Sequence, residues 1–295
     1  MNFKGVFPPV PTPFRDDEVD VGALCDNIRK LLETRLGGVV VLGSNGEAVF
    51  LDEDESVRIV AAARKVVPAD RLLIAGTGRQ ATRAAVLATR RAADAGADAV
   101  LVRTPSFFKS LMTAEAFVRH YTAVADASPV PVLLYNFTAV TGVTLHAAAV
   151  AELSGHPNIV GMKESGSDMA LLADYVAVAH PPFAVLAGSG LSFLSGLLLG
   201  ARGAILALAV VVPDLCIQVF DLAATGRIGE AVDLQRRLLP LARAVTSRFG
   251  VGGLKVAQQV AGYAGGPVRG PLLPAPPEAT PLIRQLLLDL QVPVA

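Results

Sequence analysis

Eight short apolar runs, rich in β-branched residues or leucine, recur along the chain with helical patterns between them. They are Gly5–Val10, Gly38–Leu42, Leu72–Ala75, Ala99–Val102, Val130–Tyr135, Ile159–Lys163, Ala184–Ala187 and Ala204–Leu208. Continuous apolar runs without alternation are typical of strands buried on both faces, as in a parallel sheet. The pattern therefore predicts an α/β protein with a (β/α)8 TIM barrel. A doubly wound open sheet is the alternative, but it requires a glycine-rich phosphate turn where this chain has Pro8-Pro9-Val10-Pro11.

Two of the connecting segments carry clear helix-start signals. Asp52 stands three residues before Glu55, which is the spacing of a capping box, and the periodic segment Val57–Val67 follows. Thr113 is placed to cap a helix over Ala114–Ala127. Both signals support helices between the predicted strands.

The last seventy or so residues continue beyond the eighth β/α unit. Leu222–Arg248, Leu254–Ala264 and Thr280–Leu290 have helical patterns, and proline-rich connections separate the last two. We therefore predict a barrel domain over residues 1–225 and a helical extension over residues 226–295 that packs on the barrel.

The composition indicates which binding partners are disfavoured and which cellular compartment is expected. The 26 basic and 26 acidic residues balance, so no electrostatic footprint for nucleic acid or an anionic membrane is present, and no apolar run has the length of a membrane span. The first residues, Met1 to Gly5, lack the features of a secretory signal. Cys25 and Cys216 lie far apart without metal-ligand spacing, as expected for free thiols in a reducing cytoplasm. We expect a cytoplasmic protein.

Polar residues cluster where the predicted strands end, which is where a barrel of this kind carries its chemistry. These clusters are Gly43–Glu47, Gly76–Gly78, Thr104–Phe108, Tyr135-Asn136, Lys163–Ser165 and Gly188–Gly190. They converge on one barrel mouth that holds one lysine, one tyrosine and several hydroxyls.

Lys163 is the most informative of these residues, because it is the one lysine inside a core-strand pattern. Burial of an ammonium is costly, which favours the neutral amine, and a neutral amine is a nucleophile for carbonyl carbons. The alternative is a lysine that reaches water at the strand end or pairs with a carboxylate.

Ser44, Asn45 and Tyr135 extend this candidate site. A hydroxyl, an amide and backbone N–H groups between two glycines can cradle a carboxylate or an oxyanion, although Gly, Ser and Asn are also common in ordinary turns. Tyr135 is either an acid–base group or a strand-end aromatic with a wet hydroxyl.

Three other kinds of site are disfavoured. The histidines, His120, His146, His156 and His180, fall on helices or on loops that feed strands, so a metal site at the mouth lacks its usual ligands. Glu164 should point away from the lumen if Lys163 points in, because side chains alternate along a strand, and this removes a carboxylate pair with Glu47. Ser44 has neither a nearby histidine nor the elbow of a serine hydrolase.

The motifs Gly43-Ser44-Asn45-Gly46-Glu47, Tyr135-Asn136 and Gly161-Met162-Lys163-Glu164 resemble those of the dihydrodipicolinate synthase and N-acetylneuraminate lyase superfamily. The resemblance covers essentially the whole chain. Within the superfamily it is strongest to 4-hydroxy-2-oxoglutarate aldolases of the mitochondrial type, on the stretches His156–Lys163 and Arg248–Lys255.

This resemblance implies a Schiff base between Lys163 and pyruvate or a related 2-oxo acid, with Tyr135 as the general acid–base and Ser44 as its relay. It implies that the substrate contacts a further set of residues, namely Ser44, Asn45, Gly46, Phe107, Thr138, Val140, Ser165, Gly188 and Ile205. It also implies an aldehyde as second substrate, no metal or organic cofactor, and a homotetramer built as a dimer of dimers.

Three departures from the superfamily pattern bear on the substrate. Ser106-Phe107-Phe108 lacks the tyrosine that usually joins the proton relay from a neighbouring subunit. Val140 stands where dihydrodipicolinate synthases carry an arginine for the second substrate, which disfavours that activity. Thr138 and Val210 replace a common proline and a frequent asparagine beside the distal pocket.

Several readings stay open on the sequence. They are a 2-keto-3-deoxy sugar acid aldolase or dehydratase, a dihydrodipicolinate synthase, a keto-acid binding protein without turnover, and a pyridoxal-phosphate barrel that uses Gly188–Gly190 as a phosphate loop. The favoured reading is a metal-independent, Schiff-base aldolase that cleaves or forms a 4-hydroxy-2-oxo acid.

Overall fold

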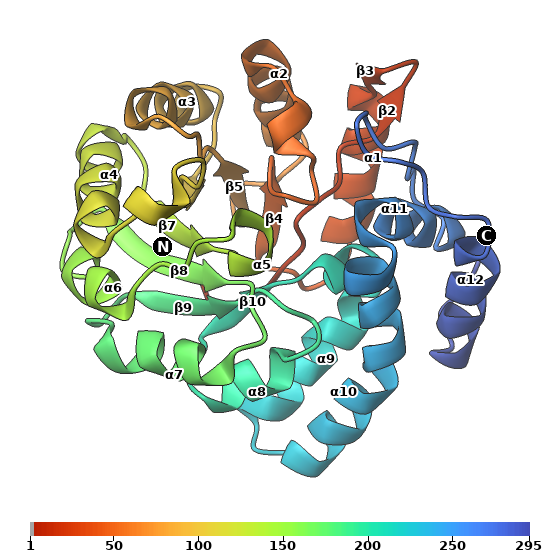
Figure 1. Cartoon of the computed structure of the whole chain (residues 1–295). Coiled ribbons are helices and arrows are strands. Elements are labelled where there is room, and N and C mark those ends of the chain that lie inside the picture. The colour runs from red at the N-terminus through yellow and green to blue at the C-terminus, as the bar shows by residue number, and fades with distance from the viewer. Residues whose placement is uncertain (1–2) are drawn as a thin grey trace.

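A computed structural model describes residues 3–295 of the chain. Met1 and Asn2, the first two residues of the segment considered for a secretory signal, lie outside the described residues. Eight parallel strands form one sheet in the order β1-β10-β9-β8-β7-β6-β5-β4. Their bounds are β1 Gly5–Phe7, β4 Gly38–Val41, β5 Leu72–Gly76, β6 Ala99–Arg103, β7 Val132–Asn136, β8 Ile159–Glu164, β9 Ala184–Ala187 and β10 Gly203–Ile205. A parallel bridge between Pro9 and Val40 joins the two ends of the sheet. The predicted (β/α)8 barrel is confirmed (Figure 1).

Helices surround the strands in Figure 1. They are α1 Val21–Leu32, α2 Glu53–Arg64, α3 Thr82–Asp94, α4 Ala114–Ala127, α5 Thr138–Thr141, α6 Ala147–Leu153, α7 Met169–Val178, α8 Phe193–Leu198 and α9 Pro213–Ala224. A small antiparallel hairpin, β2 Phe14–Arg15 with β3 Glu18–Val19, follows the first strand. No helix among residues 3–295 is long and apolar enough to cross a membrane.

Local sequence signals set the helix starts. The Asp52 side chain accepts a hydrogen bond from the Glu55 N–H at 2.7 Å, and the Glu55 carboxylate accepts one from the Asp52 N–H at 3.0 Å. This is the predicted capping box, and it satisfies two N–H groups that a helix leaves free at its start. Thr113 caps α4 as predicted, because its hydroxyl accepts from the Ala116 N–H at 3.2 Å.

Strand residues alternate between two apolar regions. One face of each strand packs against the helices in the larger core, and the other fills the barrel lumen with side chains such as Phe7, Val40, Ile74 and Leu133. Side chains at every second position of a strand share a face. The strand ends that close this lumen therefore set which polar groups meet at the mouth.

The C-terminal helices are α10 Ile228–Arg243, α11 Gly250–Val260 and α12 Ala279–Asp289, which lie together on one flank in Figure 1. The periodic segment Leu222–Arg248 is not one helix. It breaks at Gly226, whose φ of 74° lies in the left-handed region, and a π-helical turn over Ala244–Arg248 ends it. The eighth apolar run also leaves the sheet early, because a 3-10 turn begins at Ala207.

Candidate active site

Lys163 lies in β8 with its side chain in the lumen and only 6% exposed. Its Nζ donates a hydrogen bond to Tyr135 Oη at 3.5 Å and stands 4.5 Å from the centre of that ring. Among residues 3–295 no ion pair forms at this nitrogen. Of the two readings of Lys163, the structure therefore supports an amine held inside the barrel over a salt-bridged or solvated one.

Tyr135 connects Lys163 to the loop after β4. It lies opposite Lys163 in the register of β7 and β8, and its hydroxyl is 3.2 Å from Ser44 Oγ. The chain Ser44–Tyr135–Lys163 links a hydroxyl, a phenol and an amine by hydrogen bonds. Such a chain can carry a proton between the amine and a bound substrate, because each group both accepts and donates.

Glu47 anchors the loop that carries Ser44, because it contacts two residues of the C-terminal extension. Its side chain is buried and its backbone is left-handed, with a φ of 55°. One carboxylate oxygen pairs with Lys255 Nζ at 2.5 Å, and the other accepts from the Arg269 N–H at 2.8 Å. Lys255 also donates to the Pro267 carbonyl at 2.6 Å and lies over the Phe14 ring. Burial lowers the pKa of Lys255, and Glu47 opposes that shift.

Glu164 points away from the lumen, as predicted from the alternation with Lys163. Its carboxylate accepts from Asn136 Nδ2 at 2.6 Å and from the Gly166 N–H at 2.5 Å. Burial raises the pKa of Glu164, while the bond from Asn136 opposes the shift. The Asn136 carbonyl oxygen of the side chain accepts in turn from the Leu145 N–H at 2.9 Å. These bonds tie the ends of β7 and β8 together outside the barrel and so position Tyr135 and Lys163.

Gly188 brings the end of β9 close to the end of β8. A Cβ at this position would lie 2.2 Å from Ser165 Oγ and 2.7 Å from the Glu164 carbonyl, so only glycine fits there. Within residues 3–295 the buried Ser165 hydroxyl has no hydrogen-bond partner. Ser165 is thus a buried polar group at the end of β8 that does not line the cavity described next.

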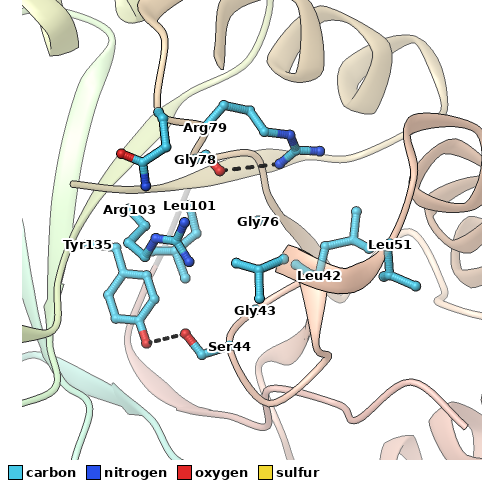
Figure 2. A pocket seen from close by; sticks show the side chains of 13 residues that line it. Leu42, Gly43, Ser44, Leu51, Gly76, Gly78, Arg79, Leu101, Arg103 and Tyr135 are labelled. Atoms are coloured by element: carbon cyan, nitrogen blue, oxygen red, sulfur yellow. Dashed lines mark hydrogen bonds between the residues drawn. The ribbon is translucent and has the colours of Figure 1, made fainter. Parts of the chain in front are cut away.

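A cavity of about 350 Å³ opens beside Tyr135 and Ser44 (Figure 2). Its wall is formed by Leu42, Gly43, Ser44, Ala48, Val49, Leu51, Gly76, Gly78, Arg79, Gln80, Leu101, Arg103 and Tyr135. Lys163 is not part of this wall and reaches it through its bond to the Tyr135 hydroxyl. The cavity has the size of sites that hold small metabolites.

The structure brings some predicted site residues together and sets others apart. Ser44 and Tyr135 line the cavity, and Ile205 is fully buried in the lumen below. Phe107 and Val140 are 77% and 59% exposed and do not line it.

Two further predicted residues, Gly46 and Thr138, make hydrogen bonds within the protein. The Gly46 carbonyl accepts from Thr12 Oγ1 at 2.7 Å, and the preceding residue, Asn45, does not line the cavity. The Thr138 hydroxyl lies 3.0 Å from that of Thr144. In residues 3–295, no three side chains of His, Cys, Asp or Glu are grouped as a metal ion would need.

Sequence reasoning missed the two arginines of the cavity wall, Arg79 and Arg103. Arg103 is the last residue of β6 and follows the lumen-facing Leu101 at the strand period of two. That spacing was visible in the sequence and marks a cation at a strand end, as it does for Lys163. Arg79 follows the Gly76-Thr77-Gly78 stretch at the end of β5.

Comparison with known proteins gives consistent matches over nearly the full length. The sequence model of the dihydrodipicolinate synthetase family matches residues 2–289. A 4-hydroxy-tetrahydrodipicolinate synthase of Methanothrix thermoacetophila is 36% identical, over 97% of this chain and 96% of that protein. A probable mitochondrial 4-hydroxy-2-oxoglutarate aldolase of Emericella nidulans is 37% identical, over 94% and 92%.

Solved structures agree with these sequence matches. Dihydrodipicolinate synthase from Thermotoga maritima superposes with a TM-score of 0.94 at 26% identity, over 98% of this chain and 99% of that one. A prophage protein of E. coli K12 from the dihydrodipicolinic acid synthase family, solved in complex with pyruvate, has a TM-score of 0.91 at 29% identity, over 99% and 100%.

Proposed function

The chain belongs to the dihydrodipicolinate synthetase family, and from that membership we propose that it is a metal-independent Schiff-base lyase for 4-hydroxy-2-oxo acids such as 4-hydroxy-2-oxoglutarate. Pyruvate and an aldehyde are the products of cleavage. The observation that carries the proposal is the hydrogen-bonded chain Ser44–Tyr135–Lys163 at the barrel mouth. The names of the family relatives, synthases and aldolases, support carbon–carbon lyase chemistry.

The proposed reaction begins at Lys163. Its amine, in the neutral form, attacks the C2 carbonyl of the 2-oxo acid, and loss of water gives an iminium ion. Ser44, Asn45 and the backbone N–H groups beside them hold the C1 carboxylate. The iminium then withdraws the electron pair of the C3–C4 bond.

Tyr135 donates and accepts the protons that the cleavage step requires. Tyr135 first gives its proton to the water that departs as the iminium forms; as the C3–C4 bond then breaks, its phenolate oxygen takes the proton of the C4 hydroxyl, the aldehyde formed at C4 leaves, and C3 becomes part of an enamine. The Tyr135 proton returns to C3, and Ser44 Oγ, 3.2 Å away, relays protons to the mouth. Water hydrolyses the resulting iminium, so that pyruvate and the free amine are released.

Trapping the covalent intermediate tests this proposal. The protein is incubated with pyruvate and reduced with borohydride, and the modified residue is located by mass spectrometry. We expect the mass increment on Lys163 and none on Lys255, the second buried lysine. Lys163→Ala should lose both the adduct and pyruvate release, and label elsewhere or nowhere would defeat the mechanism.

The names of several relatives favour a second candidate, synthesis of 4-hydroxy-tetrahydrodipicolinate from pyruvate and aspartate semialdehyde. Val140, which stands on α5 with its side chain exposed, argues against it because no cation occupies that position. A panel of 4-hydroxy-2-oxoglutarate, 2-keto-3-deoxy sugar acids and aspartate semialdehyde separates the candidates. Cleavage releases pyruvate, dehydration of a sugar acid does not, and synthesis consumes it.

We also propose a homotetramer in the cytoplasm. Phe107, Phe108 and Leu111 are 77%, 65% and 64% exposed on the loop after β6, which favours a contact between subunits. The free thiols Cys25 and Cys216 fit a reducing compartment. Light scattering on the purified protein tests the assembly, and a mass of one chain would reject it.

A further inference from the structure

Arg103 stands at the same level as Tyr135 and Lys163 on three successive strands. The register pairs Arg103 with Tyr135 and Tyr135 with Lys163, so Arg103 lies two strands, about 10 Å, from the lysine. Figure 2 shows its guanidinium beside the Tyr135 ring, within the cavity wall. It is therefore on the side of the phenol opposite the reactive amine.

The Arg103 guanidinium has no hydrogen-bond or ion-pair partner among the described residues, and its buried Nε in particular has none. Burial lowers the pKa of Arg103, and the neighbouring Arg79 adds to that effect. A partly buried guanidinium without an anion is costly, which indicates that an anion completes the site when substrate is bound.

Arg79 is not the cation that lacks an anion, because Glu53 already compensates its charge. Its Nε donates to Glu53 Oε1 at 2.8 Å, and its terminal nitrogen donates to the Gly78 carbonyl at 3.2 Å. Among the described residues that line the cavity there is no acidic side chain. Of the described residues in the cavity wall, Arg103 therefore carries the one positive charge that no acidic side chain compensates.

The cavity leaves room for a ligand in front of Arg103. Gly78 lies against it so closely that a Cβ would stand 2.5 Å from the Arg103 backbone nitrogen and 2.9 Å from its Cβ. Gly76, one position inward on the same face, also lacks a side chain. Gln80 holds the loop above by accepting from the Ser106 and Phe107 N–H groups at 2.8 and 3.0 Å.

From this arrangement we infer that Arg103 binds a carboxylate on the aldehyde half of the substrate and thereby selects 2-oxo acids with a second acidic end. A single uncompensated guanidinium matches a carboxylate, which has one charge and two oxygens for the guanidinium fork. A phosphate, with a charge of about −1.5 to −2, would be only partly neutralised. This inference rests on the proposed function for the position of the reactive carbon at Lys163.

A pair of uncleavable ligands tests the subsite separately from turnover. 2-Oxoglutarate and 2-oxopentanoate have the same chain length and lack the C4 hydroxyl, and they differ in a distal carboxylate against a methyl group. Binding of each is measured by calorimetry to the full-length protein and to three variants: Arg103→Met, Arg103→Lys and Arg83→Met. Arg83 is exposed on α3, so its replacement makes the same charge change away from the cavity.

We expect the protein to bind 2-oxoglutarate about 10- to 100-fold more tightly than 2-oxopentanoate, as a hydrogen-bonded charge pair gives. Arg103→Met should remove this preference and leave 2-oxopentanoate binding within about twofold, since the Schiff base at Lys163 and the hydrogen bond from Ser44 to the C1 carboxylate are retained. Arg103→Lys should keep part of the preference, and Arg83→Met all of it.

Equal binding of the two ligands to the unaltered protein would overturn the subsite. So would an equal loss for both ligands in Arg103→Met, which is the result of a merely structural role. Tighter binding of a phosphate-ended 2-oxo acid than of 2-oxoglutarate would overturn the choice of a carboxylate. Failure of the proposed function has a different signature, namely no borohydride adduct at Lys163 and no pyruvate release from any substrate.

Discussion

Replacement of Lys255 by methionine tests how the C-terminal extension supports the active site. Lys255 and Glu47 have side chains that are 2% and 0% exposed, and their charged atoms are 2.5 Å apart. Lys255→Met leaves the Glu47 carboxylate buried with only the Arg269 N–H as a partner. Removal of one partner from a buried ion pair costs about 3–5 kcal/mol of unfolding free energy.

The double variant Glu47→Gln/Lys255→Met should recover most of this loss. Burial dominates the lowered pKa of Lys255, so desolvation of the ammonium outweighs its attraction to Glu47. Glutamine keeps one oxygen that can accept from Arg269 N–H, and no isolated charge remains. We expect the double variant within about 1–2 kcal/mol of the parent, so that Glu47→Gln added to Lys255→Met recovers about 1–4 kcal/mol of the stability that the single variant loses.

Denaturant unfolding followed by far-ultraviolet circular dichroism measures these energies, since the chain has no tryptophan for fluorescence. Lys65→Met is the control, because Lys65 is exposed on the surface and its loss should change stability by less than about 0.5 kcal/mol. Pyruvate release should fall in Lys255→Met, because Glu47 anchors the loop of Ser44. A Lys255→Met variant within about 1 kcal/mol of the parent, or a double variant no more stable than Lys255→Met, would refute the reasoning.

Three further outcomes are expected. Tyr135→Phe should lower kcat by about 100-fold or more while borohydride still labels Lys163; full activity would remove Tyr135 from the mechanism. Ser44→Ala should raise KM for pyruvate in the synthetic direction by about tenfold, as one lost bond to a carboxylate predicts; an unchanged KM in steady-state kinetics would contradict this. Burial lowers the pKa of His120 from 6.5 to about 4, so the unfolded chain binds the proton more tightly and stability is lost as pH falls from 6.5 towards 4. Between pH 7.5 and 5 the loss is about 2 kcal/mol, and denaturant unfolding of His120→Phe should show a correspondingly smaller decline; an equal decline in both proteins would exclude His120 as its source.

The barrel was predictable because its signals are local. Each strand is buried on both faces and appears as one apolar run, and the Asp52–Glu55 box marks a helix start within four residues. Lys163 was recognisable because a cation inside such a run is rare. The break at Gly226 was less visible, since Leu222–Arg248 keeps its helical period on either side of the turn.

The electrostatic setting of the site was not predictable, because its partners are distant in the chain. Glu47 receives its hydrogen bond from Arg269, which is 222 residues away, and no periodic pattern reports such a contact. Arg103 was missed for another reason. The apolar run ends at Val102, whereas the strand continues to Arg103. The Arg103 side chain follows Leu101 on the lumen face, but the apolar pattern alone does not indicate that it belongs to the strand.

The segment around Arg269 also bears on how the protein matures during synthesis. Its guanidinium binds both oxygens of Glu55 at 2.8 Å and the Phe50 carbonyl at 3.1 Å, and these partners lie 214 and 219 residues earlier in the chain. A chain leaving the ribosome grows by about 5–20 residues per second, and N-terminal parts fold first. The basic partners of Glu47 and Glu55 are therefore synthesised after most of the barrel. We expect the loop that carries Ser44 to reach its final position only near the end of translation.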